Sequence, residues 1–166
     1  DLGWDIEKQT EVLLREIDES DYDLVIGSSM GGLAAANASS LRGGSGFRLL
    51  LIAPAFGLYD GWEGLTEEEL SEWREVGTRR YKGFELDMDL GWGFMEAAGR
   101  MSWPEPLHRT TIVHGKKDDV VSIEVSRKVA REAALVDLVE IDDGHRMKEC
   151  LHLLSGLASE LMSRGA

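Results

Sequence analysis

Apolar and polar positions along this 166-residue chain form short blocks that alternate between two periodicities. Continuous apolar runs bounded by turn residues predict buried strands at 22–28, 47–55, 110–114 and 135–141. Segments with apolar residues three and four positions apart predict helices at 2–17, 30–41, 122–133 and 148–162. Strands rich in Val, Ile and Leu that alternate with helices are typical of a parallel sheet covered on both faces. The pattern therefore predicts an α/β fold.

Polar residues mark where several of these helices begin. Asp5 and Ser122 directly precede predicted helices, and we expect them to be N-caps because their side-chain oxygens can accept free first-turn N–H groups. Residues 66–69, Thr-Glu-Glu-Glu, have the spacing of a capping box and open another helix toward Trp73.

One segment, residues 57–107, interrupts the alternation of strands and helices. It separates two predicted strands by about fifty residues, which is too long for a plain connection. It contains four of the five tryptophans, Trp62, Trp73, Trp92 and Trp103, and a second predicted helix at 90–101. We therefore expect a structured cap, 57–107, inserted into a single domain that spans 1–166.

Charge and cysteine content exclude several classes of partner. The formal net charge is −13, from 31 acidic and 18 basic residues, which argues against nucleic acid and against anionic membrane surfaces. No apolar run approaches the 18 or so residues of a membrane span. A lone cysteine, Cys150, excludes an internal disulfide and a Cys-based zinc site. We expect a cytoplasmic protein with no metal and no cofactor.

Residues 27–31, Gly-Ser-Ser-Met-Gly, match the pattern G-x-S-x-G. The motif follows an apolar strand and opens a helix of small residues, which is the context of a nucleophile elbow. Side chains at positions 27 and 31 are expected to collide with the neighbouring helix and strand. Ser29 would then be the nucleophile, and the N–H of Met30 would stabilise an oxyanion at the helix N-terminus. A turn that binds phosphate, or that only turns, fits the same pattern.

Two further motifs follow the last two predicted strands. In the first, a strand ends in His-Gly, and Asp118 comes three residues after that glycine. We expect His114 to be a structural residue at the strand end. In the second, His145 follows a glycine on the loop after the last strand. His108 and His152 lie before a strand and inside a helix, and we do not expect them to be catalytic.

The three motifs gain specificity from their order along the chain, which is Ser29, Asp118, His145. All three residues follow predicted parallel strands, so they are expected at the same edge of the sheet. Serine needs a base to take its proton, histidine is a base near neutrality, and a carboxylate fixes the histidine tautomer. The order Ser…Asp…His is that of α/β-hydrolases.

With these motifs the sequence resembles the α/β-hydrolase superfamily, and within it the small esterase-like members of the YqiA/YcfP type. The resemblance is carried by the motifs IGSSMGG, LLLIAPAFG, IVHGKKDDVV and DDGHRM, at 26–32, 49–57, 112–121 and 142–147. It implies an α/β-hydrolase-like three-layer sandwich with a mostly parallel sheet and a helical cap. It also selects Asp118 over Asp119 as the acid and His145 as the base.

The resemblance has one gap, at the start of the chain. The first strand of the family fold ends in a loop that supplies the second oxyanion N–H, and neither has a counterpart here. We therefore expect the fold to be incomplete at its N-terminus, with the missing segment upstream or on another chain.

The leading interpretation is a serine hydrolase that cleaves a small carboxylic ester or thioester through an acyl-enzyme. Trp62 and Trp92 are candidates for substrate binding, although a place in the cap's own core is the more common role for such tryptophans. The expected partner is a small-molecule ester or thioester, and a homodimer is kept as an option. Two alternatives are a non-catalytic α/β-hydrolase-like binding module and a serine-dependent acyltransferase.

Overall fold

A computed structural model describes residues 3–44, 46–62, 64–83 and 86–163. Its centre is a four-stranded sheet with the spatial order β1-β2-β5-β6, formed by β1 (Leu24–Ser28), β2 (Arg48–Ile52), β5 (Thr110–Gly115) and β6 (Val136–Ile141). Each strand runs parallel to its neighbours, and Leu51 of β2 lies level with Gly27 and Ile112. The predicted parallel sheet is therefore confirmed.

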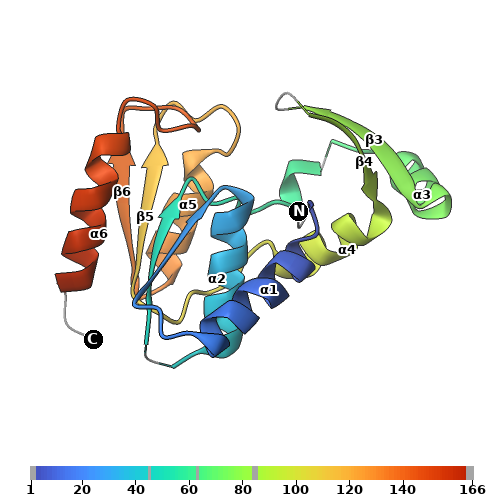
Figure 1. Cartoon of the computed structure of the whole chain (residues 1–166). Helices are drawn as coiled ribbons and strands as arrows, with labels where there is room; N and C mark the ends of the chain where they lie inside the picture. The colour runs from blue at the N-terminus through green and yellow to red at the C-terminus, as the bar shows by residue number, and fades with distance from the viewer. Residues whose placement is uncertain (1–2, 45, 63, 84–85, 164–166) are drawn as a thin grey trace.

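Helices cover both faces of this sheet, as Figure 1 shows. One face is covered by α2 (Met30–Arg42) and α5 (Ile123–Glu132), with α1 (Ile6–Glu19) packed against α2, and the other by α6 (Leu154–Ser163). Along β2, Leu49 and Leu51 belong to the core under α2 and α5, whereas Leu50 belongs to the core under α6. Because β2 is buried on both faces, it is a continuous apolar run rather than an alternating one.

The connection from β2 to β5 forms a separate layer at one side of the sheet (Figure 1). It contains the 3₁₀ turn η1 (Asp60–Trp62), α3 (Glu67–Val76), an antiparallel hairpin of β3 (Thr78–Gly83) and β4 (Leu86–Gly91), and α4 (Trp92–Met101). We call these elements the cap. Trp73, Leu90, Phe94 and Met95 form its buried centre. The hairpin is a difference from the expected helical cap, and α4 begins at Trp92 because residue 90 still belongs to β4.

Helix starts follow the predicted caps at Asp5, Thr66 and Ser122. The Asp5 carboxylate accepts the N–H of Lys8 at 2.9 Å, and Thr66 and Glu69 form both hydrogen bonds of the capping box. The last helix starts later than predicted, at Leu154 after the 3₁₀ turn η2 (Leu151–Leu153). The preceding N–H groups of residues 149 and 150 bind the Asp143 carboxylate instead, so they take part in a loop and not in a helix.

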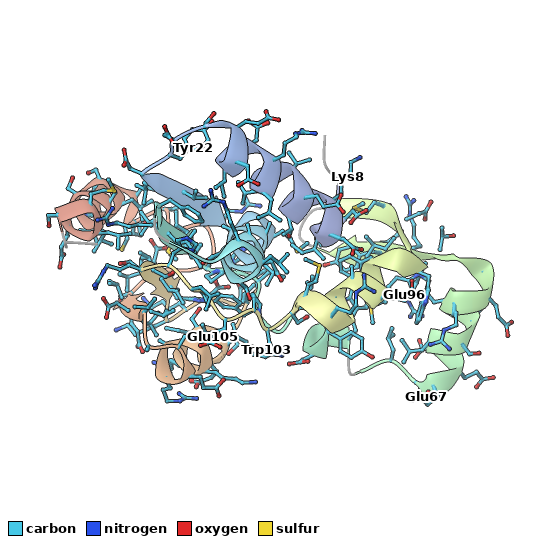
Figure 2. The ribbon with its side chains drawn as sticks, turned by 90° about the horizontal axis from the view of Figure 1, so that it is seen from below. Lys8, Tyr22, Glu67, Glu96, Trp103 and Glu105 are labelled. Carbon is cyan, nitrogen blue, oxygen red and sulfur yellow. The ribbon has the colours of Figure 1, made fainter. Side chains whose placement is uncertain are left out.

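Many charged side chains lie on the outside of the molecule. Figure 2 shows Lys8, Glu67, Glu96 and Glu105 on the ribbon, and all four are exposed. Within the described ranges, no helix is both long enough and apolar enough to cross a membrane. The same residues contain no cluster of three or more His, Cys, Asp or Glu side chains placed to hold a metal ion.

Candidate active site

Ser29 lies on a strained turn between β1 and α2. Its backbone has φ 51 and ψ −118, a conformation that residues other than glycine rarely adopt. Two hydrogen bonds to the end of β2 hold it there, from Ser29 N–H to the Ile52 carbonyl at 2.9 Å and from Ala55 N–H to the Ser29 carbonyl at 3.1 Å. The turn is therefore fixed from both sides of its peptide.

The glycines around Ser29 have unequal roles. A Cβ at Gly27 would lie 2.5 Å from the Gly31 carbonyl oxygen, and one at Gly32 would lie 3.0 Å from Pro54 Cβ. A Cβ at Gly31 meets nothing within 4 Å. The expected collision at position 27 is thus confirmed, the one expected at 31 is wrong, and the second close approach belongs to Gly32. The reason is that α2 turns its Gly32 side, not its Gly31 side, toward the loop after β2.

The structure brings Ser29, His145 and Asp118 into one line. His145 Nε2 is 3.2 Å from Ser29 Oγ, and His145 Nδ1 is 2.8 Å from Asp118 Oδ2. Since a carboxylate only accepts, Nδ1 carries the proton and Nε2 is free to accept the serine hydroxyl. The Asp118 side chain is fully buried, whereas the His145 side chain is 18% exposed and is open to a substrate.

The loop after β5 explains why Asp118, and not its neighbour, meets His145. Asp118 Oδ1 accepts the N–H groups of Val120 and Val121, each at 2.9 Å. These bonds fold the loop around the carboxylate and leave Oδ2 for the histidine. Asp119 is exposed and lies at the wall of the adjoining cavity.

Asp143 shapes the loop that carries His145. Its buried carboxylate accepts the N–H groups of Gly144 at 2.8 Å, Glu149 at 2.8 Å and Cys150 at 3.0 Å. Burial pushes the pKa of Asp143 up, but these backbone hydrogen bonds outweigh it and hold the pKa below its usual range. Sequence reasoning missed this residue, although the Asp-Gly-His spacing contained it.

The remaining histidines lie outside the line of three. His152 is exposed on η2, and His108 is buried between Phe47 and Ser39. His114 is buried at the end of β5, where its ring contacts Ser126 and the Val121 carbonyl.

A cavity of about 1180 Å³ opens beside Ser29 and His145. One wall comes from the loops of the sheet, and the other is an aromatic wall made by Trp4, Trp62, Tyr81 and Phe94. Trp62 packs on Tyr81 and Phe94 with ring centroids 5.7 Å apart in both cases. Burial raises the pKa of Tyr81, so its phenol stays neutral. The lining of this cavity beside Ser29 is mainly apolar.

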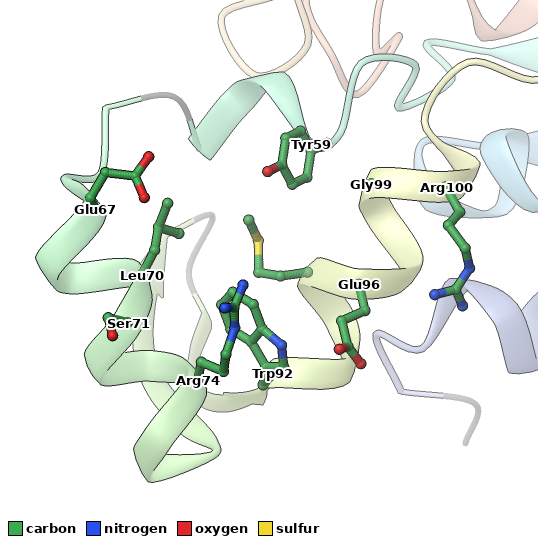
Figure 3. Close-up of a pocket in the computed structure, with 10 residues that line it drawn as sticks. Tyr59, Glu67, Leu70, Ser71, Arg74, Trp92, Glu96, Gly99 and Arg100 are labelled. Carbon is green, nitrogen blue, oxygen red and sulfur yellow. The ribbon is translucent and has the colours of Figure 1, made fainter.

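Trp92 lies at a different cavity, of about 810 Å³, between α3 and α4. Figure 3 shows the Arg74 side chain over the Trp92 ring, with Leu70 and Glu96 nearby. The Arg74 guanidinium carbon is 4.8 Å from the ring centroid, which is the geometry of a cation–π contact. Because Trp92 is on this side of the cap, we do not retain it as a substrate-binding residue.

Met30 is the first residue of α2, directly after Ser29. The N–H groups of a first helical turn have no acceptor within the helix, so the Met30 N–H is free to bind an oxyanion. The N–H of Ala55 is not available for this purpose, because it binds the Ser29 carbonyl.

Comparison with known proteins shows that this architecture recurs widely. Mouse alpha/beta hydrolase domain-containing protein 10 matches with a TM-score of 0.79 and 23% identity, over 96% of this chain and 70% of the mouse chain. A monoacylglycerol lipase from Paleococcus ferrophilus gives 0.69 and 14% identity, over 97% and 76%. Est1E from Butyrivibrio proteoclasticus gives 0.68 and 19%, over 95% and 68%. The fold is therefore that of the α/β-hydrolases.

Sequence comparison adds a family but no close relative. Residues 4–159 match a family described as Uncharacterised protein family (UPF0227). No curated protein matches the sequence at a significant level.

Proposed function

The chain belongs to the uncharacterised protein family UPF0227, and from this premise and its active-site geometry we propose that it is a serine hydrolase of small carboxylic esters or thioesters. One observation carries the proposal. Ser29, His145 and Asp118 are joined by contacts of 3.2 and 2.8 Å at the mouth of a cavity large enough for a small ester. A phosphate-binding turn would require neither the histidine nor the buried carboxylate.

The reaction follows from the protons that these groups can hold. Ser29 Oγ attacks the acyl carbon while His145 Nε2 takes its proton, and the Met30 N–H binds the oxyanion that forms. His145 then gives the proton to the leaving oxygen or sulfur, which departs and leaves an acyl-Ser29. Water, deprotonated by His145, releases the acid and restores the hydroxyl. Asp118 stabilises the imidazolium in both halves of the reaction.

The orientation of the substrate follows from the same geometry. The leaving group has to lie beside His145, because that ring protonates it. The acyl group then points away from the histidine, toward the cap and its aromatic wall. Burying apolar acyl surface there contributes about 25 cal/mol per Å², so a longer apolar acyl group is expected to bind more tightly.

Trp62 and Trp92 allow this orientation to be tested with matched variants. Both are tryptophans of the cap core, but Trp62 lines the cavity beside Ser29 and Trp92 lines the other one. We expect Trp62→Ala to lower kcat/KM for octanoyl esters more than for acetyl esters, and Trp92→Ala to leave the ratio of the two unchanged. Equal ratios in both variants would show that the acyl group does not bind against the aromatic wall.

The main experiment is hydrolysis of p-nitrophenyl esters of graded chain length by the wild type and Ser29→Ala. The variant removes one hydroxyl, so we expect stability to change by less than about 1 kcal/mol. Turnover should fall by roughly 10⁴-fold or more, because triad members act as a unit. Activity that persists in a clean Ser29→Ala preparation would exclude Ser29 as the nucleophile.

Two alternatives can be distinguished from this function with the same variants. A fluorophosphonate probe that labels the wild type but not Ser29→Ala excludes a non-catalytic binding module. With a dilute alcohol or amine acceptor in water, an acyltransferase would pass most of its acyl group to the acceptor, whereas a hydrolase would release mainly the free acid. The homodimer and the cytoplasmic location remain predictions, which gel filtration and cell fractionation can test.

A further inference from the structure

His114 is a second histidine that lies close to the Asp118 carboxylate. Its side chain is fully buried at the end of β5. His114 Nε2 lies 3.2 Å from Asp118 Oδ2 and 2.9 Å from the Val121 carbonyl oxygen, and Nδ1 lies 2.7 Å from Ser126 Oγ. The Asp118 carboxylate is therefore flanked by two imidazole rings, one open to the cavity and one enclosed.

The partners of His114 determine where its protons lie. A carbonyl and a carboxylate only accept hydrogen bonds, so Nε2 carries the hydrogen; it binds the Val121 carbonyl and lies 3.2 Å from Asp118 Oδ2. The Ser126 hydroxyl then donates to Nδ1. Burial lowers the pKa of His114, against the Val121 carbonyl and the Asp118 charge, which raise it. The enclosed ring is a neutral imidazole with one defined tautomer.

Asp118 needs this donor because no water reaches it. Its side chain has no exposed surface, and a buried carboxylate requires hydrogen bonds to most of its lone pairs. Oδ1 has the two N–H groups of Val120 and Val121, whereas Oδ2 has the His145 Nδ1–H and the His114 Nε2–H. Without His114, one ring alone would hold Oδ2.

We propose that His114 is a positioning residue, whose Nε2–H holds Asp118 Oδ2 at the point where it orients His145. This inference rests on the proposed function, since it assigns a role in the same site. The Nε2–H also draws carboxylate charge toward itself and so weakens the pull of Asp118 on a protonated His145. Removing the donor has two consequences. The Asp118 carboxylate is held less firmly, which lowers the rate. Its attraction for a protonated His145 also becomes stronger, which moves the acid limb of the rate profile to higher pH.

The charged groups around His114 do not reverse this direction. Asp118 and His145 face it from the two loops, and Glu140 of β6 is its register partner. Glu140 is ion-paired with Arg127 at 2.6 Å, so its charge is compensated on α5. Ser126 and Val121 contribute only neutral groups. These neighbours remain the same in a variant that changes the ring alone.

Gln and Asn at position 114 form a matched pair for the test. A Gln side-chain amide reaches about the place of Nε2 and can donate to Asp118, whereas an Asn amide reaches only about the place of Nδ1. We expect His114→Gln to keep kcat within about threefold of the wild type, and His114→Asn to lose about 10- to 100-fold, as outer partners of functional groups do. The acid limb of kcat should move up by about half a pH unit in His114→Asn alone.

A second readout separates this inference from the proposed function. The ring signals of His145 can be followed against pH by NMR in the free protein, with no substrate. They should titrate at higher pH in His114→Asn than in His114→Gln. If the wild type hydrolyses no ester, the proposed function fails while this titration still decides the role of His114. Identical titrations in the two folded variants would overturn the inference.

Ser126→Ala covers the case in which the Asn variant does not fold. It leaves the ring in place but removes the hydroxyl that holds Nδ1, so the ring and its Nε2–H are less well fixed. We expect the same upward shift of the acid limb, with a loss of kcat of a few-fold. An unchanged profile with a reduced melting temperature would mean that His114 and Ser126 only support the fold, and it would equally overturn the inference.

Discussion

Replacing Gly27 by Ala tests whether the tight turn at Ser29 is required for activity. The new Cβ would lie 2.5 Å from the Gly31 carbonyl oxygen and 2.8 Å from its carbon, where ordinary contacts begin at 3.4 Å. The first turn of α2 therefore has to move away from β1 by roughly 1 Å, the difference between the first and last of these distances. All the atoms it meets are backbone, so no side chain can rotate aside to relieve the contact.

The expected effect on activity is larger than the effect on stability. Overpacking of this kind costs about 1–3 kcal/mol of unfolding free energy, which a stable domain tolerates. A misplacement of about 1 Å in the reacting geometry, however, costs about 10²-fold in rate. Ser29 lies between the two clashing segments and has only one histidine contact, at 3.2 Å, to set its direction. We therefore expect Gly27→Ala to fold, but with turnover about 100-fold lower.

Gly31→Ala is the matched control, because a Cβ there meets nothing within 4 Å. Ala in a helix is about 0.5–1 kcal/mol more favourable than Gly, so this variant should be as stable as the wild type or more so. The assay is kcat/KM for p-nitrophenyl butyrate, together with urea unfolding of all three proteins. If Gly27→Ala retains full turnover, or if Gly31→Ala loses as much, the close approach does not position Ser29.

Three further results are expected. Asp118→Asn should lower kcat by about 10³- to 10⁴-fold, because an amide cannot hold the required tautomer of His145. Asp119 is exposed, so Asp119→Asn should lower kcat less than about threefold. Equal losses in the two variants would contradict the loop geometry. Burial lowers the pKa of His108, and the nearby Arg42 charge lowers it further. As the pH falls, the unfolded chain therefore takes up the proton on this histidine before the folded chain does. The contribution of His108 to the free energy of unfolding is therefore fully present above about pH 6.5. At lower pH it decreases by up to about 1.4 kcal/mol per pH unit. Urea unfolding between pH 7.5 and 5.5 should show a shallower loss in His108→Gln, and parallel losses would refute the assignment. A third comparison, between His145→Ala and His152→Ala in the ester assay, should show turnover abolished only in the former.

The sheet could be predicted from the sequence because its two central strands, β2 and β5, are buried on both faces. In the run at residues 47–55, Arg48 is the one polar position, and the predicted ends of the strands differ from the observed ends by only a few residues. At its C-terminal end the strand stops at Ile52, before the end of the apolar run, because the backbone of Ala53 has a φ of 42. No residue type in this run indicates that conformation. The spatial order β1-β2-β5-β6 depends on tertiary packing, which a pattern along the chain does not contain.

The cap was predicted less well, for a physical reason. Its hairpin strands alternate, with Tyr81, Met88 and Leu90 on the inner side and charged residues on the outer side. That period was readable, but each strand is short and one runs directly into α4, so a single helix fitted the apolar positions equally well. Which tryptophan faces the nucleophile depends on the direction of that hairpin, and for this reason Trp62 and Trp92 were not distinguishable in sequence.

Two carboxylates of this acidic chain differ from the others, because they are buried in the loops of the site. Asp118 and Asp143 are buried in the site loops, and among the described residues neither forms an ion pair with Lys or Arg. Backbone N–H groups stabilise both charges instead, with two imidazole rings at Asp118. Such N–H groups are fixed in direction, so a carboxylate that binds them also fixes the shape of its loop. The spacing within each motif therefore determines at once how the buried charge is stabilised and where the catalytic side chain lies. That is why the short motifs predicted the site better than the fifty residues of the cap predicted its wall.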